Sequence, residues 1–260
     1  MAAFSNALHA TDQADGLRRL FGGSSQRLVP VVHNPHVVCS GVLMERLSLA
    51  MAELGARILV VDAADNAPVA HELVDIDLPA CIERLDDHVA YLAARGLPRR
   101  HVDMRGSSEA WLAAVEQAAP WADVIVLHAG ARDLARMCGP REISPILLAT
   151  VESPSLTDAY ASMKLLSQRL GLRVFDLLVG MQARPRRAAA VGERLATCAD
   201  NFLGAVLRAC VPVDRTEPLN QPASEPLSRL AAQQMLGLAG AGELALLPDA
   251  SMRPQAVAHY

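Results

Sequence analysis

Length, composition and charge limit what this chain can be. It has 260 residues, of which 52% are hydrophobic and 20% charged, and its formal net charge is −4. That length fits one large α/β domain with a sizeable core, and the charge gives no general attraction to nucleic acid. No apolar run reaches the ~18 residues of a membrane span, and the N-terminus lacks the basic and apolar regions of a secretory signal. Five scattered cysteines without a C-x-x-C pair are typical of free thiols, so we expect a soluble, cytoplasmic protein.

The first predicted element is a short N-terminal helix. Thr11 is a favourable N-cap residue, and Asp12 and Asp15 would lie near the positive end of a helix over residues 12–20. The stretch F-G-G-S-S that follows, residues 21–25, is typical of a flexible linker. We therefore expect residues 1–25 to form a helix and a linker ahead of the main domain.

Strands and helices then alternate along the chain. Apolar runs predict strands at 28–32, 57–61, 101–104, 123–127, 146–151, 174–179 and 205–211. Helical periodicity predicts helices at 42–54, 78–95, 108–118, 155–170, 187–202 and 226–236. This alternation indicates right-handed βαβ units, so the predicted fold class is α/β, a mostly parallel sheet flanked by helices over residues 26–237. Residues 238–260, which end in a proline-containing stretch of mixed polarity, are expected to be a disordered tail.

The second predicted strand carries a family resemblance. Residues 56–68, A-R-I-L-V-V-D-A-A-D-N-A-P, resemble the second strand and switch I of the MinD/ParA-type P-loop ATPases. With Asp62 as the reference, the family's phosphate loop aligns without a gap to N-P-H-V-V-C-S-G, residues 34–41. In that family the loop is glycine-rich, has a lysine near its start and ends in Gly-Lys-Thr at the helix entrance. The resemblance implies a MinD/ParA-like, P-loop NTPase-like three-layer fold and, where the site is intact, ATP hydrolysis.

The aligned loop lacks the residues that hold phosphate. Its substitutions are Pro35 for the early lysine, Cys39 for the glycine before the catalytic lysine, Ser40 for that lysine and Gly41 for the threonine that ligates Mg²⁺. Glycines let successive backbone N–H groups curl around phosphate, whereas β-branched Val37 and Val38 resist that curvature and Pro35 has no N–H. Without the lysines, the phosphate charges find no fixed counter-charge in this loop.

The metal-binding part of the site is altered as well. His128 occupies the position of an aspartate that contacts the metal through water, and the switch I pattern D-x-D becomes Asp62-Ala-Ala64, with Asp65 displaced by one residue. The sequence therefore predicts a degenerate nucleotide site with no catalytic residues, no cofactor and no ATP hydrolysis. An atypical ATPase with residual ATP binding stays open as the alternative.

Two further segments resemble one MinD-like subfamily, the flagellar-number regulators FlhG/FleN. Residues 12–18, D-Q-A-D-G-L-R, match its N-terminal D-Q-A-x-x-L-R signature, and residues 152–181 resemble its strand–helix–strand block around L-T-D-A-Y-A. The resemblance implies that the N-terminal helix binds FlhF, the flagellar signal-recognition-type GTPase, and stimulates its GTP hydrolysis. The residues implied for this contact are Asp12, Gln13, Ala14, Leu17 and Arg18, with Gln13 reaching the partner's nucleotide site.

The same resemblance bears on other partners. It implies flagellar basal-body proteins as further partners, and recruitment by partners to the cell pole or the inner membrane face. The family also has a C-terminal amphipathic membrane helix, but residues 226–236 carry one cation, Arg229, so we expect membrane association to be weak or absent. Two alternatives stay open: residues 12–20 pack on their own domain, or the chain is a MinD-like adaptor of another polar or secretion assembly.

A histidine- and cysteine-containing stretch raises the question of a metal site. His33, His36 and Cys39 are side-chain types that bind Zn²⁺, and His128 could reach the same mouth of the sheet. A loop that has lost its original role accumulates such residues equally well, so no metal is predicted.

Other polar residues have structural interpretations. Glu45 and Arg46 are expected on a solvated helix face. Ser155 and Asp158 have the spacing of a capping pair at the start of a helix.

Overall fold

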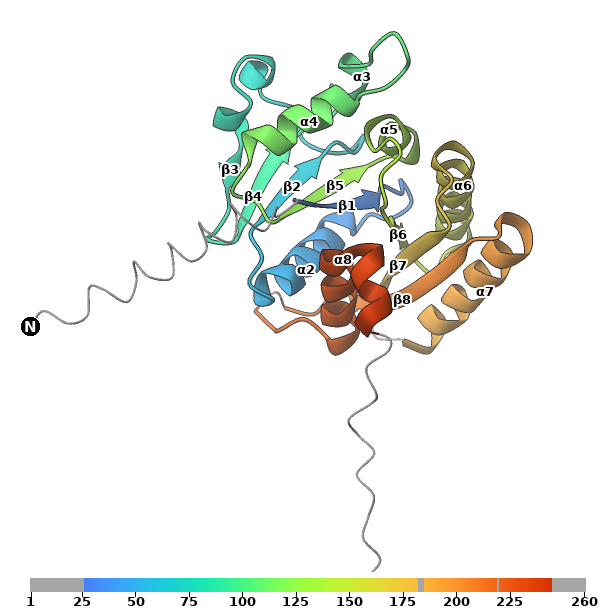
Figure 1. The fold of residues 1–260 in the computed structure, drawn as a ribbon. Coiled ribbons are helices and arrows are strands. Elements are labelled where there is room, and N and C mark those ends of the chain that lie inside the picture. Colours follow the sequence, from blue (N-terminus) through green and yellow to red (C-terminus); the bar gives the residue numbers. More distant parts are fainter. Residues whose placement is uncertain (1–25, 182–184, 219, 245–260) are drawn as a thin grey trace, which may run out of the picture.

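The computed structural model describes residues 26–181, 185–218 and 220–244 (Figure 1). Its strands are β1 (Arg27–Val32), β2 (Ile58–Asp62), β3 (Glu83–Arg84), β4 (Val89–Ala93), β5 (Val124–Ala129), β6 (Ile146–Ala149), β7 (Val174–Met181) and β8 (Val206–Asp214). Its helices are α2 (Ser40–Glu53), α3 (Leu97–Arg100), α4 (Glu109–Ala118), α5 (Ala131–Met137), α6 (Ser153–Leu170), α7 (Pro185–Leu203) and α8 (Glu225–Leu244), with 3-10 turns at Glu72–Asp75 and Pro79–Cys81. The predicted helix over 12–20 and the end of the predicted tail lie outside the described residues.

The strands form one sheet in the order β3-β4-β2-β5-β1-β6-β7-β8. All of these pairings are parallel except that of β3 with β4. Every residue of β5 and β6 is buried, because these strands lie inside the sheet and have helices over both faces. The predicted α/β class and the mostly parallel sheet are confirmed.

Two helical layers cover the sheet (Figure 1). On one face α2 and α8 lie side by side, and Leu43, Leu47, Leu227 and Leu230 pack with the sheet in one apolar core. On the other face α4, α5, α6 and α7 cover a second core, which holds residues such as Leu112 and Leu166. The sheet between these cores carries the polar groups described below at the carboxyl ends of its strands.

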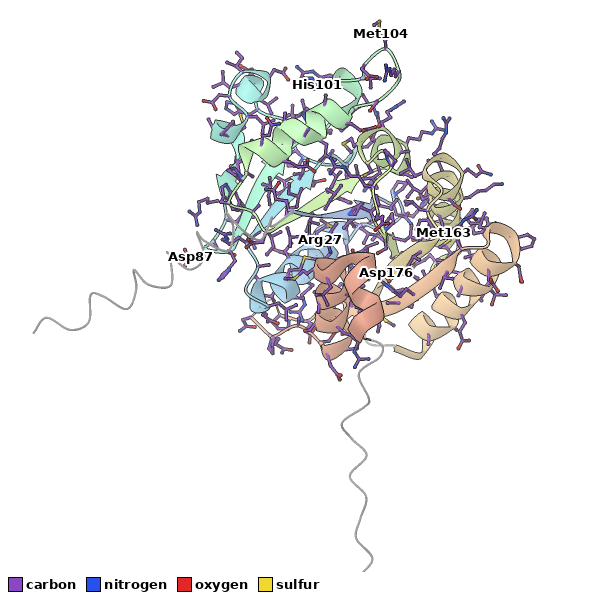
Figure 2. The ribbon with its side chains drawn as sticks, viewed as in Figure 1. Arg27, Asp87, His101, Met104, Met163 and Asp176 are labelled. Atoms are coloured by element: carbon purple, nitrogen blue, oxygen red, sulfur yellow. The ribbon has the colours of Figure 1, made fainter. Side chains whose placement is uncertain are left out.

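A buried polar group fixes α8 to the sheet. Asp176 on β7 is fully buried and accepts hydrogen bonds from Arg208 Nε (3.1 Å) and from Gln234 Nε2 of α8 (2.7 Å). Gln234 also donates to Ser144 O over 2.9 Å, and Arg27 donates to Met235 O over 3.0 Å. Figure 2 labels Asp176 and Arg27 in this region. The helix predicted at 226–236 thus turns its apolar side to its own domain, and it continues to Leu244.

Two predictions between residues 70 and 140 are wrong, and one helix, α5, was not predicted. The predicted helix at 78–95 is a 3-10 turn followed by the short strands β3 and β4, because pairing with β2 holds V-A-Y-L-A extended. The predicted strand at 101–104 is a turn closed by the Asp103 side chain, which accepts hydrogen bonds from the N–H groups of Arg105 and Ser107 at 2.8 Å each. Helix α5, with seven residues, was too short for its periodicity to be recognised.

Candidate functional site

The carboxyl ends of β1, β2 and β5 form the candidate site, since ligands of open α/β sheets bind at this edge. Asp62 ends β2 and is paired in register with His128 on β5. His128 Nδ1 lies 2.9 Å from Asp62 Oδ1, so Nδ1 carries the proton that the carboxylate accepts. The Tyr91 hydroxyl on β4 donates to Asp62 Oδ2 over 3.2 Å. Three neighbouring strands therefore hold one hydrogen-bonded group, Asp62–His128–Tyr91.

This group keeps Asp62 in its charged form. Burial alone would raise the pKa of Asp62, but the hydrogen bond from His128, together with those from Ala64 N–H and Tyr91, outweighs burial and leaves this pKa below its usual value. Burial and the neighbouring Asp62 carboxylate raise the pKa of Tyr91. Asp62 is thus an anion with both oxygens already engaged by the protein.

A second histidine lies against the first. The rings of His33 and His128 meet edge to face, with centroids 5.2 Å apart and an interplanar angle of 70°. Burial, with a smaller contribution from His128, lowers the pKa of His33, against the opposing effect of Asp65 and Asp62. Nδ1 of His33 and Nε2 of His128 are buried and have no hydrogen-bond partner among the described residues. These two histidines therefore lie side by side at one mouth of the sheet.

The other residues of the zinc hypothesis point elsewhere. His36 is exposed, and the Cys39 sulfur lies against β7, so close to Gly180 that a Cβ added there would be 2.7 Å from it. Within the described ranges, no group of three or more His, Cys, Asp or Glu side chains could hold a metal ion. The geometry therefore does not assemble His33, His36 and Cys39 into one set of ligands.

Asn34 fixes the start of the loop that follows β1. It is buried, and its Nδ2 donates to Leu148 O of β6 and to Ser155 O of α6, at 2.9 Å each. Its Oδ1 accepts the N–H of His36 over 3.0 Å. Ser155 Oγ in turn accepts the N–H of Thr150 over 3.0 Å. The side-chain amide of Asn34 thus connects the loop to β6 and α6.

The backbone of the loop over residues 34–41 does not form an open anion-binding site. The N–H of Val37 donates to Asn34 O (3.0 Å) and that of Ser40 donates to Val37 O (3.2 Å), so these amides are used within the turn. The Val37 side chain is 1% exposed and fills the core under α2, whereas Val38 is 94% exposed. A phosphate loop needs inward-facing N–H groups, and a core-filling valine holds this backbone in a different shape.

The remaining aligned positions are split between core and surface. Pro35 is exposed, Ser40 is buried as the first residue of α2, and a Cβ added at Gly41 would meet open space. Asp65, the displaced switch I residue, is exposed and pairs with Arg99 at 2.9 Å.

A groove of about 550 Å³ runs beside α2 and reaches the candidate site. One wall is α2, through Gly41, Met44, Glu45, Ser48, Leu49 and Ala52. The floor is Val60 of β2 with Val89 and Tyr91 of β4, and Leu85 and Asp86 border it. Asp62 and His128 lie at the carboxyl end of this floor. We call this hollow the α2 groove.

Arg46 does not lie on a solvated face as expected. Its side chain is 1% exposed, and Nη2 pairs with Glu217 at 2.8 Å while Nη1 donates to Gln221 O at 2.9 Å. The guanidinium also donates longer hydrogen bonds to Pro218 O and Pro222 O. The guanidinium therefore holds the segment between β8 and α8. Glu45, by contrast, is exposed as predicted.

The capping interpretation of Ser155 and Asp158 is also wrong. Helix α6 begins at Ser153, so both residues lie inside it, and burial raises the pKa of Asp158.

Sequence reasoning missed Asn34, Tyr91 and the role of Ser155. Only Asn34 left a local signal, because Asn-Pro is typical of a turn. Asp12, Gln13, Ala14, Leu17 and Arg18 lie outside the described residues.

The fold of this chain is similar to that of solved structures, among them ParA/MinD-family ATPases. MinD of Aquifex aeolicus aligns at 16% identity with a TM-score of 0.51, over 81% of this chain and 97% of that one. A ParA family ATPase from Chlorobium tepidum TLS aligns at 13% identity with a TM-score of 0.50, over 81% and 99%. Cobyrinic acid a,c-diamide synthase from Mycobacterium smegmatis, with bound ATP analog and magnesium, aligns at 17% identity with a TM-score of 0.55, over 82% and 95%.

The sequence on its own finds no such relatives. No protein-family model and no curated protein matches it. Within the part of the chain that the structure describes, no helix is long and apolar enough to cross a membrane. The parallel sheet flanked by two helical layers, together with these structural neighbours, identifies the fold of this chain as that of the MinD/ParA-type ATPases.

Proposed function

We propose that this chain is a MinD/ParA-type regulator of flagellar number or placement that does not hydrolyse ATP. It acts by binding an FlhF-type GTPase through residues 12–18 and stimulating GTP hydrolysis. The observation that carries the first part is the loop over residues 34–41. It has no lysine, two of its N–H groups donate to carbonyls of the same turn, and Val37 is buried. The match to D-Q-A-x-x-L-R supports the second part.

The argument against ATP rests on charge and on amide direction. A triphosphate carries several negative charges, which P-loop ATPases meet with a lysine, inward N–H groups and Mg²⁺. In this chain both oxygens of Asp62 already accept hydrogen bonds from His128 and Tyr91. A hydrated Mg²⁺ at this edge would have to break those contacts. The synthase of the same fold holds an ATP analog and magnesium, so the expected difference arises from these residues and not from the fold.

The proposed action on the partner needs few residues. Gln13 would orient the attacking water in the partner's nucleotide site, a role that a glutamine fills without being basic. Leu17 would supply apolar contact and Arg18 a charged anchor, as for a helix bound in a groove.

Isothermal titration with ATP and MgCl₂ tests the first part. We expect no saturable heat at micromolar nucleotide, with circular dichroism to show that the protein is folded. An affinity in the micromolar range would overturn the argument against ATP binding and favour the atypical ATPase.

A GTPase assay with an FlhF-type partner tests the second part. The full chain should raise the rate of GTP hydrolysis, and Gln13→Ala should cut that stimulation about tenfold or more. Gln168→Ala, an exposed glutamine on α6, is the matched control and should leave stimulation unchanged. A wild-type chain, or a peptide of residues 1–22, that leaves the GTPase rate unchanged would remove the flagellar assignment.

A further inference from the structure

The α2 groove has the properties of a docking surface. Within the described residues α2 and α8 are the helices on this face, and they leave β4 uncovered, so that Val89 and Tyr91 are half-buried and Leu85 is 61% exposed. The acidic side chains of Glu45, Asp62 and Asp86 line the groove, and no lysine or arginine among the described residues does. An apolar segment with positive charge would match both features.

Two buried polar atoms in the groove add a second observation. Ser48 is 4% exposed and His128 3% exposed, yet Ser48 Oγ and His128 Nε2 have no hydrogen-bond partner among the described residues. Buried polar atoms are rarely left without a partner in native proteins. An occupant that brings polar as well as apolar groups would satisfy them.

The register of the sheet brings the start of the domain close to this groove. Arg27 on β1 pairs with Val124 on β5, which pairs with Ile58 on β2, which pairs with Val89 on the groove floor. Three strand spacings separate Arg27 from Val89, a distance of about 14 Å. The linker over residues 21–25, which precedes Gln26, can span up to about 17 Å when extended. The chain just ahead of the domain can therefore reach the groove.

The groove also has a suitable length. Its α2 wall runs from Gly41 to Ala52, which is about 17 Å along a helix axis, and a helix over residues 12–20 would measure about 14 Å. Strand and helix directions place the Ala52 end nearest to Gln26. A chain entering there would lay Leu20 and Leu17 beside Leu49, Leu85 and Val89, and would bring Arg18 and Arg19 to the acidic rim.

We propose that residues 12–20 bind in the α2 groove of their own chain. The tether makes this contact intramolecular, so that an intrinsic affinity in the millimolar range is enough to populate it. Leu17 and Arg18 would contact either the groove or the proposed GTPase, but not both at once. Residues 12–20 bound in the groove are therefore not free to bind the GTPase until it competes for them. That regulatory consequence rests on the proposed function, whereas the groove contact does not.

Site-specific photocrosslinking in the full chain tests the contact. The amino acid p-benzoylphenylalanine in place of Leu20 should crosslink within one chain to Met44 or Leu49, as mapped by mass spectrometry. Leu85→Asp should lower the yield about fivefold or more, because it removes an apolar wall at an exposed position that the fold tolerates. Ile76→Asp, at another exposed apolar position that does not line the groove, is the control and should keep the yield.

A charge exchange sharpens the result. Glu45→Arg should lower the crosslink yield, and Arg18→Glu in the same chain should restore it. Crosslinks that join two chains would overturn the proposal in favour of a second copy as the occupant. Crosslinks outside the groove, or a yield that is unchanged by Leu85→Asp, would overturn it as well.

The GTPase assay then separates the two proposals. If groove and partner compete, Leu85→Asp should increase stimulation at limiting partner concentration about fivefold, by freeing residues 12–20. Crosslinking to the groove without any GTPase stimulation would leave the intramolecular contact intact and remove the proposed function. Stimulation without groove crosslinks would do the reverse.

Discussion

His128 Nδ1 on β5 lies 2.9 Å from Asp62 Oδ1 on β2, where the two residues face each other in the register of the parallel sheet. In the MinD/ParA-type family that the sequence resembles, these positions serve nucleotide and metal. Here the two side chains engage each other in an internal hydrogen bond. The physical reason is that a half-buried carboxylate without a counter-charge needs strong donors, and the imidazole and Tyr91 provide them.

His128→Leu should destabilise the fold by about 1–3 kcal/mol at pH 7, because it leaves the half-buried Asp62 carboxylate short of a donor. Urea unfolding followed by circular dichroism measures this. The pKa of Asp62 is lowered by folding, so its contribution to stability is present above the ordinary carboxyl pKa of 3.8 and is lost as the pH falls through the lower value. The difference between wild type and variant should therefore shrink as the pH falls below 3.8. His88→Leu, at an exposed position, should show neither effect.

His33 predicts a second pH dependence, at milder acidity. Burial lowers the pKa of His33, so the folded state favours the neutral ring and the unfolded state binds a proton first. Stability should fall as the pH drops below the usual histidine value of 6.5. His33→Phe should flatten this slope between pH 7 and pH 5 in thermal unfolding, and exposed His36→Phe should not. An unchanged slope in His33→Phe would show that another group titrates there.

Asp176 and Arg208 form a buried pair whose members should not be removed singly. Arg208→Met leaves the fully buried Asp176 without its cation and should cost about 3–5 kcal/mol in urea unfolding. The double variant Arg208→Met/Asp176→Leu should recover part of that loss, because no unpaired charge is left. Arg229→Met breaks the exposed pair with Glu225 on α8 and should change stability by no more than about 0.5 kcal/mol.

Arg46 predicts a local effect on the segment that joins β8 to α8. Arg46→Met removes a guanidinium that contacts Glu217 and three backbone carbonyls, and should cost about 2–4 kcal/mol. Limited proteolysis should show faster cleavage between residues 215 and 224. Arg46→Lys should rescue little, since an ammonium cannot reach the same acceptors in one plane. Arg194→Met, at an exposed position on α7, should leave both the stability and the cleavage pattern unchanged.

The predicted elements succeeded where a strand is buried on both faces. After their first residues, the segments over 57–61 and 123–127 are apolar, and β2 and β5 lie there with almost every residue buried. Prediction failed at the edge of the sheet. Leu78, Ile82, Leu85 and Val89 recur at helical spacing, although the first three precede β4 and only Val89 lies in it. Only pairing with β2 decides that this segment is extended.

For the candidate site, too, some features follow from the sequence and others depend on the tertiary structure. The absence of lysine and glycine from residues 34–40 is a property of the sequence, because charge and backbone freedom belong to each residue wherever it lies. Where Val37 points, and which amides the turn consumes, depend on the core beneath α2.

The sequence by itself determined the α/β alternation, the parallel sheet and the chemical content of the first loop, since these follow from local periodicity and residue type. Tertiary structure alone decided which polar groups meet. Asn34 donates to Ser155 across 121 residues, and Asp62 meets His128 across 66, because strand order places their backbones side by side. A hydrogen bond depends on distances of a few tenths of an ångström, and no one-dimensional pattern fixes such distances.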